Sequence, residues 1–305
     1  MGQKTKSFYA PGKLLISGEY LVLKGAQALA IPVKFGQHLI VNSKEGDSIH
    51  WKAKDYKGRV WFEAQYLLSS LDILSSTDIE KAKKLRKILL ESGVNLKITN
   101  AVEVETKLDF PNDWGLGSSS TLITLVAQWM SENPLDLHFK VSTGSGYDVA
   151  VAKEKSAILY SKHNNKVDVE KNNWQPPFRK KLFFIHLNKK QNSDNQVANF
   201  SSISNQISEE TYREFSDITK NMLNCTELSE FNQLIVLHES KLSKILNRQT
   251  IKEQYFSDYT DGEIKSLGAW GGDFVLATGE DTSMKYFLKK NYMTIFSWDE
   301  MVFHA

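Results

Sequence analysis

The sequence contains one cysteine, six prolines, no long apolar run and almost no excess of either charge. A single cysteine, Cys225, excludes an intramolecular disulfide and favours a reducing compartment. The 38 lysines and arginines nearly balance the 36 aspartates and glutamates, which argues against nucleic acid or an anionic membrane as a partner. No apolar stretch approaches the roughly 20 residues that span a bilayer, and the polar N-terminal segment lacks the apolar core of a signal peptide. We therefore expect a cytoplasmic enzyme or binding protein, either a monomer or a homodimer.

Common catalytic signatures are also missing. The seven histidines are scattered and none forms HExxH, which argues against a zinc hydrolase. The glycine turn at Gly115 and Gly117 is not followed by the lysine of a Walker A loop, and Ser120 breaks the GxGxxG spacing of a dinucleotide site. Any phosphate-binding function must therefore rest on another pattern.

That turn is nevertheless the most informative part of the chain. Alternating apolar residues over 102–110 predict a strand, and the apolar run after Thr121 predicts a helix that starts near Ser119. A helix that begins at a glycine turn presents free backbone N–H groups to an anion, and serine hydroxyls can bind phosphate or Mg²⁺. The alternative is an ordinary capped helix.

The rest of the chain predicts strands mixed with helices, so we expect an α+β fold in both halves. The polar segment 164–177 is interpreted as a crossing between domains. Helices are expected over 67–75, 79–91 (with Asp78 as N-cap), 119–133, from 147, 209–223, 228–246 and 283–290. Further strands are expected over 7–9, 14–23, 37–41, 94–99, 157–160, 182–187, 274–278 and 293–298.

Three other segments have residues suited to chemistry. Lys13 follows a Pro-Gly pair in an apolar strand, where it either faces an anion or extends to the surface, and Glu19 lies on the same face of that strand. Asp148 begins a helix after a glycine turn, as a general base or as an ordinary first-turn acid. A third glycine turn over 266–274 runs into a strand.

In this order, these segments resemble the three motifs of the GHMP kinases, named for galactokinase, homoserine, mevalonate and phosphomevalonate kinases. The resemblance covers residues 10–23, 115–121 and 268–277, and the string at 144–150 is similar to a bacterial subgroup close to mevalonate and phosphomevalonate kinases. It implies an N-terminal ATP-binding α+β domain with a left-handed βαβ unit over 1–175. A ferredoxin-like C-terminal domain over 176–305 is implied as well.

The resemblance also implies site residues. Lys13 and Asp148 are the implied catalytic residues, and Mg²⁺ is implied to bind Ser119 and Glu19. The implied ATP site consists of Gly115, Leu116, Gly117, Ser118, Ser119, Ser120 and Thr121. The implied substrate residues are Glu19, Tyr20, Gly146, Tyr147, Lys190, Ser193, Gly268, Gly271 and Gly272.

The chain departs from the family pattern at three places. In mevalonate kinases a helix between the second motif and the catalytic aspartate supplies a glutamate for Mg²⁺, and no such helix is evident between Thr121 and Asp148. Tyr20 and the Gly-Gly-Asp string at 271–273 favour phosphomevalonate kinases, and Trp270 is bulky for its position.

We expect ATP-dependent phosphoryl transfer to the hydroxyl of a small metabolite, and mevalonate is the first candidate acceptor. The alternatives are transfer to a phosphate acceptor, as in phosphomevalonate kinase, a catalytically silent nucleotide- or metabolite-binding protein, and an α+β scaffold whose glycine turns are structural.

Overall fold

The structure is a computed structural model of the chain and describes residues 5–163, 166–189, 200, 202–268, 270 and 272–304. The chain divides into two compact units that do not follow a single cut of the sequence. The first holds the residues up to Gly12, Phe35–Asn112 and Leu116–Lys155, and the second holds Lys13–Lys34, Asp113–Gly115 and the residues from Ser156 onward. The predicted boundary between residues 175 and 176 stays a prediction.

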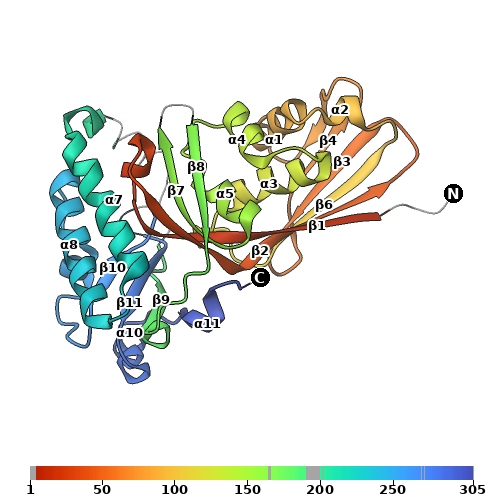
Figure 1. Cartoon of the computed structure of the whole chain (residues 1–305). Coiled ribbons are helices and arrows are strands. Elements are labelled where there is room, and N and C mark those ends of the chain that lie inside the picture. Colours follow the sequence, from red (N-terminus) through yellow and green to blue (C-terminus); the bar gives the residue numbers. More distant parts are fainter. Residues whose placement is uncertain are drawn as a thin grey trace. The chain divides into compact units, whose positions relative to one another are not determined.

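The first unit is a sheet with helices on one face (Figure 1). Its strands follow the order β5-β4-β3-β6-β2, and β3, β4 and β6 alternate between buried and partly exposed residues, so one face carries the core. The strands are β2 (Ala28–Ser43), β3 (Ser48–Lys54), β4 (Val60–Leu67), β5 (Ile73–Ser76) and β6 (Val102–Leu108). The helices are α1 (Ile79–Glu91), α2 (Val94–Lys97), α3 (Ser118–Met130), α4 (Pro134–Val141) and α5 (Tyr147–Glu154).

Strands β3 and β6 pair in parallel, with Trp51 opposite Val104. Parallel neighbours need a crossover, and here the connection contains β4, β5, α1 and α2. This is the βαβ unit that the family resemblance implies, and the hand of the crossover stays a prediction.

The second unit contains the long strand β1 (Thr5–Ser17) from Lys13 onward and the start of β2. Ala28 of β2 pairs with Tyr160 of β7 (Ala157–His163), and β7 pairs with β8 (Lys166–Asn172). Short 3₁₀ helices are η1 (Leu21–Lys24), η2 (Arg179–Lys181), η3 (Ser204–Gln206) and η4 (Asp281–Ser283).

A second sheet, of order β10-β11-β9-β12, completes this unit, and its pairs are antiparallel. When the four strands are numbered along the chain from β9 to β12, they lie side by side in the order second, third, first and fourth. Helices follow the first and the third strand, and this is the ferredoxin-like arrangement. Its strands are β9 (Leu182–His186), β10 (Ile264–Ser266), β11 (Phe274–Thr278) and β12 (Ile295–Ser297). Its helices are α7 (Glu209–Asn224), α8 (Leu228–Leu246), α9 (Ile251–Tyr255), α10 (Met284–Lys289) and α11 (Trp298–Met301). The predicted α+β class and the ferredoxin-like topology are confirmed.

Most predicted helices are confirmed, including α1 with Asp78 as its N-cap, whose carboxylate accepts from the N–H groups of Glu80 and Lys81. Four predictions are wrong. The strand predicted over 14–23 ends at Ser17, and residues 21–23 belong to the 3₁₀ helix η1. Residues 67–75 end β4 and turn into β5, residues 94–97 form the helical turn α2, and most of the crossing predicted at 164–177 is strand β8. In the part of the chain that the structure describes, no helix combines the length and apolar character needed to cross a bilayer.

Candidate functional site

The glycine turn of the second motif leads directly into helix α3. Gly117 is the N-cap, with φ of +92°, and having no side chain it cannot cap the helix itself. Ser118 and Ser119 occupy the first turn, where Ser119 is exposed and Ser118 half-buried. Backbone N–H groups at an uncapped helix start attract an anion, so this end of α3 fits a phosphate group.

The next two hydroxyls of the motif are buried and already bonded. The Ser120 hydroxyl donates to the carbonyl oxygen of Gly117 at 2.8 Å, and the Thr121 hydroxyl donates to the Gln37 side-chain oxygen at 2.7 Å. These bonds hold the turn against β2 of the same unit. Ser120 and Thr121 therefore shape the glycine turn, whereas Ser119 is exposed.

Gly115, the first glycine of the motif, belongs to the second unit together with Lys13. The Lys13 ammonium donates a hydrogen bond to the Gly115 carbonyl oxygen at 3.0 Å. Trp114, just before Gly115, makes edge contacts with Phe274 and Phe296, which fix the entry to the turn. The structure thus brings the first and second motifs together at one lysine.

Asp273 is a residue of this site that the sequence analysis gave no role. A Cβ atom on Gly115 would lie 2.2 Å from its carboxylate oxygen Oδ2, so only glycine fits there. Asp273 is buried with φ of +55°, and its N–H donates to the Lys189 carbonyl at 2.8 Å. The signal that pointed to it was the Gly-Gly-Asp string, which we used only to compare family branches.

Asp148 lies in the first turn of α5, as the sequence predicted. Gly146 is the N-cap, with φ of +88°, and Asp148 is the second helical residue, partly exposed. Its carboxylate oxygen Oδ1 accepts the N–H of Val149 at 2.9 Å. Because α5 packs against α3 in the same unit, the helices that carry Asp148 and Ser119 are neighbours.

Helix α4 lies between Thr121 and Asp148, with Asn133 as its N-cap, and the sequence analysis did not expect it. None of its residues is a glutamate. The helix carries no obvious metal ligand. Asp136 is exposed at its start, and Glu132 just before it pairs with Lys97 at 2.8 Å. Among the described residues, no group of three or more acids, histidines or cysteines is placed to hold a metal ion.

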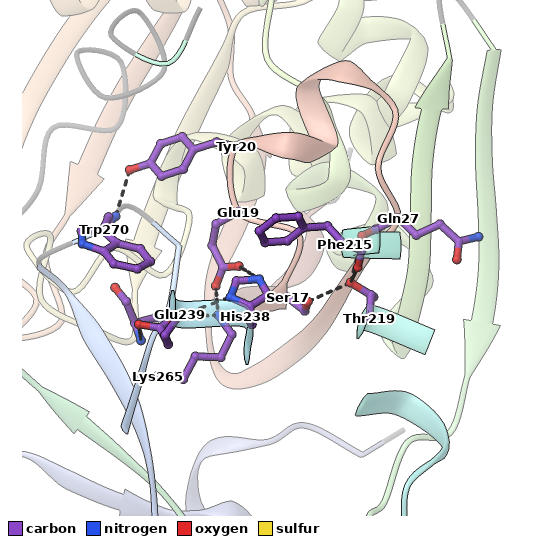
Figure 2. Close-up of polar contacts among 11 residues, drawn as sticks. Ser17, Glu19, Tyr20, Gln27, Phe215, Thr219, His238, Glu239, Lys265 and Trp270 are labelled. Atoms are coloured by element: carbon purple, nitrogen blue, oxygen red, sulfur yellow. Dashed lines mark hydrogen bonds and ion pairs between the residues drawn. The ribbon is translucent and has the colours of Figure 1, made fainter. Parts of the chain in front are cut away.

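Glu19, the predicted second Mg²⁺ ligand, is buried among charged side chains of the second unit (Figure 2). One carboxylate oxygen contacts the Lys265 ammonium, and the other lies 3.1 Å from Nε2 of His238. Burial alone would raise the pKa of the Glu19 carboxyl, but the charges of Lys265 and His238 outweigh it and lower the pKa. Because one oxygen faces the Lys265 ammonium and the other faces the His238 ring, a metal role does not suit this placement.

Tyr20 links the first motif to the third. Its hydroxyl oxygen accepts the backbone N–H of Trp270 at 2.9 Å (Figure 2). Its ring stacks on Phe200. Gly268 has φ of +68° and Gly272 is buried. Lys190, Ser193 and Gly271, also predicted to bind substrate, lie outside the described residues.

No protein-family model and no curated protein sequence matches the chain. Solved structures do. The Methanococcus jannaschii mevalonate kinase superposes with a TM-score of 0.72 at 17% identity, covering 99% of each chain. The Streptococcus pneumoniae phosphomevalonate kinase, in complex with phosphomevalonate and AMPPNP, superposes with a TM-score of 0.69 at 14% identity over 98% of each chain. The Lactococcus lactis galactokinase, in complex with galactose, superposes with a TM-score of 0.69 at 13% identity over 99% of this chain and 94% of the galactokinase chain. The chain therefore has the fold of the GHMP kinases, the family that its three glycine-rich segments resemble.

Proposed function

We propose that this protein is an ATP-dependent kinase that transfers the terminal phosphoryl group of ATP to a small metabolite in the cytoplasm. The observation that carries the proposal is the glycine turn at Gly115–Gly117, which starts α3 without a side-chain cap and whose first carbonyl oxygen accepts from Lys13. Phosphoryl transfer needs little covalent chemistry from the protein. It needs charge neutralisation and accurate positioning, and these residue types supply both.

The proposed nucleotide site runs from Gly115 to Ser119. Leu116 is fully buried and contributes only its backbone, while the N–H groups at the start of α3 and the Ser118 and Ser119 hydroxyls bind phosphate oxygens. Mg²⁺ in proteins is bound by one or two protein oxygens together with phosphates and waters, and when bound it neutralises charge on the transferred group. Ser119 is the residue proposed to hold it, since its hydroxyl is exposed beside the turn.

Lys13 and Asp148 have separate proposed roles. The Lys13 ammonium stabilises negative charge that develops on the oxygens of the reacting groups. The Asp148 carboxylate accepts the proton of the acceptor hydroxyl as that oxygen bonds to phosphorus. On the acceptor side we propose Tyr20, Gly146, Tyr147, Gly268 and Gly272.

The acceptor we propose first is a hydroxyl of a small carboxylate-bearing metabolite such as mevalonate. The second candidate acceptor is a phosphate, as in phosphomevalonate, and it is favoured by Tyr20 and the Gly-Gly-Asp string at 271–273, which resemble phosphomevalonate kinases. A phosphate acceptor has no proton that must be removed, so Asp148 would orient Lys13 rather than act as a base. A catalytically silent binding protein is a third candidate, favoured by the bulk of Trp270 in the third motif.

A coupled ADP-release assay with Mg·ATP tests the proposal. The acceptors are mevalonate, phosphomevalonate, homoserine and galactose, and the Lys13→Met variant is the blank for contaminating kinases. Acceptor-dependent ADP release that the blank lacks supports the kinase and identifies the acceptor class. Mg²⁺-dependent ATP binding by calorimetry without turnover on any acceptor would leave the silent binding protein, and no ATP binding would refute both.

A further inference from the structure

Four ionisable side chains form a buried charge cluster in the second unit that the proposed mechanism does not use (Figure 2). The members are Glu19, His238, Glu239 and Lys265, of which Lys265 and His238 are 0% exposed, Glu19 1% and Glu239 3%. Glu19 follows strand β1, the next two lie side by side on α8, and Lys265 lies on β10. Three segments far apart in the sequence therefore meet at one group of charges.

Acidic and basic side chains alternate in the cluster. The Lys265 ammonium contacts Glu19, donates to the Ser266 carbonyl at 3.0 Å and lies 3.6 Å from the Glu239 carboxylate. The two ring nitrogens of His238 lie 3.1 Å from Glu19 and 3.6 Å from Glu239, at ion-pair distance rather than in aligned hydrogen bonds. Each carboxylate thus faces both basic side chains.

Glu19 lies in a turn whose backbone is unfavourable. Gly18 before it has φ of +96°, and a Cβ there would lie 2.7 Å from the Ala28 backbone. Tyr20 after it has φ of +60°, which costs a residue with a side chain about 1–2 kcal/mol. Such conformations persist only where the surroundings hold them, and they concentrate at functional sites.

The contacts on each side of the turn supply that restraint. The Ser17 hydroxyl lies 2.8 Å from the Thr219 hydroxyl of α7, and the Tyr20 hydroxyl holds the N–H of Trp270. The same strand carries Lys13 four residues before Ser17. The cluster therefore connects the Lys13 strand on one side with the Trp270 loop on the other.

Stability alone is a weak explanation for such a cluster. Burying four ionisable groups carries a desolvation cost that their mutual attraction often only offsets, and apolar side chains of similar volume commonly do as well or better. A charged network does, however, fix the relative positions of the segments that supply its members, because a displaced partner leaves a buried charge unpaired.

We propose that the cluster of Glu19, His238, Glu239 and Lys265 is a positioning device that fixes the Lys13 amine at the Gly115 carbonyl and holds Tyr20 against Trp270. Its four members are positioning residues, because they act through the turn and not on the substrate. The effect on catalysis rests on the proposed kinase function, whereas the effect on Lys13 does not.

The test is Glu19→Gln, which keeps the shape of the side chain and removes its charge. Two readouts are measured well below the unfolding midpoint of the variant. Trace acetylation with mass spectrometry reports how readily the Lys13 amine reacts, and the coupled assay reports kcat and the KM for Mg·ATP. We expect a several-fold rise in Lys13 acetylation and a fall in kcat of about 10–100-fold, the scale of a small misplacement of a reacting group. KM for Mg·ATP should change little, because the α3 turn is not touched.

Lys241→Met is the matched control, since Lys241 lies on α8 but pairs with Glu214 at the surface. It should leave both readouts at wild-type values. Glu239→Gln is a second variant that changes a carboxylate further from the turn, so it keeps the test valid if Glu19→Gln is poorly folded.

The proposal is overturned if Lys13 acetylation is unchanged in Glu19→Gln, or in Glu239→Gln where Glu19→Gln does not fold. If the wild-type protein is an active kinase, a wild-type kcat in the variant overturns it as well. If the wild-type protein transfers phosphate to no acceptor, the proposed function fails and Lys13 acetylation alone decides this inference.

Discussion

The Lys13 ammonium donates a hydrogen bond to the carbonyl oxygen of Gly115, 3.0 Å away, although 102 residues separate them in the chain. The bond joins the lysine of the first glycine-containing segment to the turn that the second segment forms. Lys13 is only half-buried, and both partners of the bond belong to the second unit.

Because Lys13 is proposed to stabilise charge on the reacting groups, replacing it by methionine should slow phosphoryl transfer strongly while leaving the fold intact. Methionine keeps the apolar stem of the lysine and removes the charge, so we expect the free energy of unfolding to change by no more than about 1 kcal/mol. Loss of one charge-stabilising donor typically lowers kcat by about 10²–10³-fold. Urea unfolding and the coupled ADP assay give the two values, and a variant with near-normal kcat would remove Lys13 from the mechanism.

Replacing Gly115 by alanine should distort the nucleotide turn. Gly115 has φ of +67°, and a Cβ there would lie 2.2 Å from the Asp273 carboxylate, which is buried and cannot simply move away. The matched control is Gly58→Ala, at φ of +81° with nothing within 4 Å of the added atom. The control carries only the backbone strain of about 1–2 kcal/mol, whereas Gly115→Ala should cost about 1–3 kcal/mol more through overpacking.

Urea unfolding of the two glycine variants measures the difference in their free energies of unfolding. Calorimetry with Mg·ATP measures whether the turn still supports nucleotide binding. We expect Gly58→Ala to bind ATP as the wild type does and Gly115→Ala to bind it weakly. Equal stability of the two variants would show that Asp273 yields to the new atom without cost.

The only cysteine should be inert in the folded protein. Cys225 is buried at the end of α7, and burial, with a smaller contribution from Glu230, raises the pKa of its thiol from 9.0 to about 11. Because the thiolate is the reactive form, a disulfide reagent at pH 8 should react slowly with the native protein and rapidly in urea.

The same pKa shift predicts a pH dependence of stability. The unfolded chain loses the Cys225 proton near pH 9.0 and the folded chain only near 11, so this contribution is intact below pH 9.0 and is lost as the pH rises towards 11. Cys225→Ala removes that part of the pH dependence. Rapid thiol reaction in the absence of denaturant would show that this end of α7 opens readily.

Much of the fold could be predicted because its signals are local. The periodicity of 79–91 and the Asp78 cap predicted α1, and apolar alternation predicted β6. The errors were local too. Leucines spaced like a helix over 67–75 concealed a turn in which Leu71 has φ of +56° before β5 pairs back onto β4. The helix predicted over 119–133 ends at Met130, and Asn133 and Pro134 instead begin α4 as its N-cap and first residue.

The candidate site was predictable only where its residues lie in glycine-containing motifs. Lys13, Ser119 and Asp148 were found in this way, although their roles stay proposals. His238 and Lys265 carry no such signal, because a histidine on a long helix and a lysine in a three-residue strand look like ordinary polar positions. Their relation to Glu19 depends on segments that meet only in the folded chain, and for this reason the sequence alone favoured a metal role for Glu19.

The effect of Asp148→Asn should depend on the acceptor, and this separates the two candidate reactions. The introduced asparagine keeps the size of the side chain and can still accept from the Val149 N–H through its amide oxygen, so α5 should keep its first turn and the unfolding midpoint should change little. With a hydroxyl acceptor the proton must leave as the oxygen bonds to phosphorus, and loss of the base lowers kcat by about 10²–10⁴-fold. With a phosphate acceptor no proton has to be removed, so the loss should be much smaller. The measurement is kcat of wild type and variant on the acceptor found in the ADP-release screen, and near-wild-type turnover on a hydroxyl acceptor would exclude Asp148 as the base.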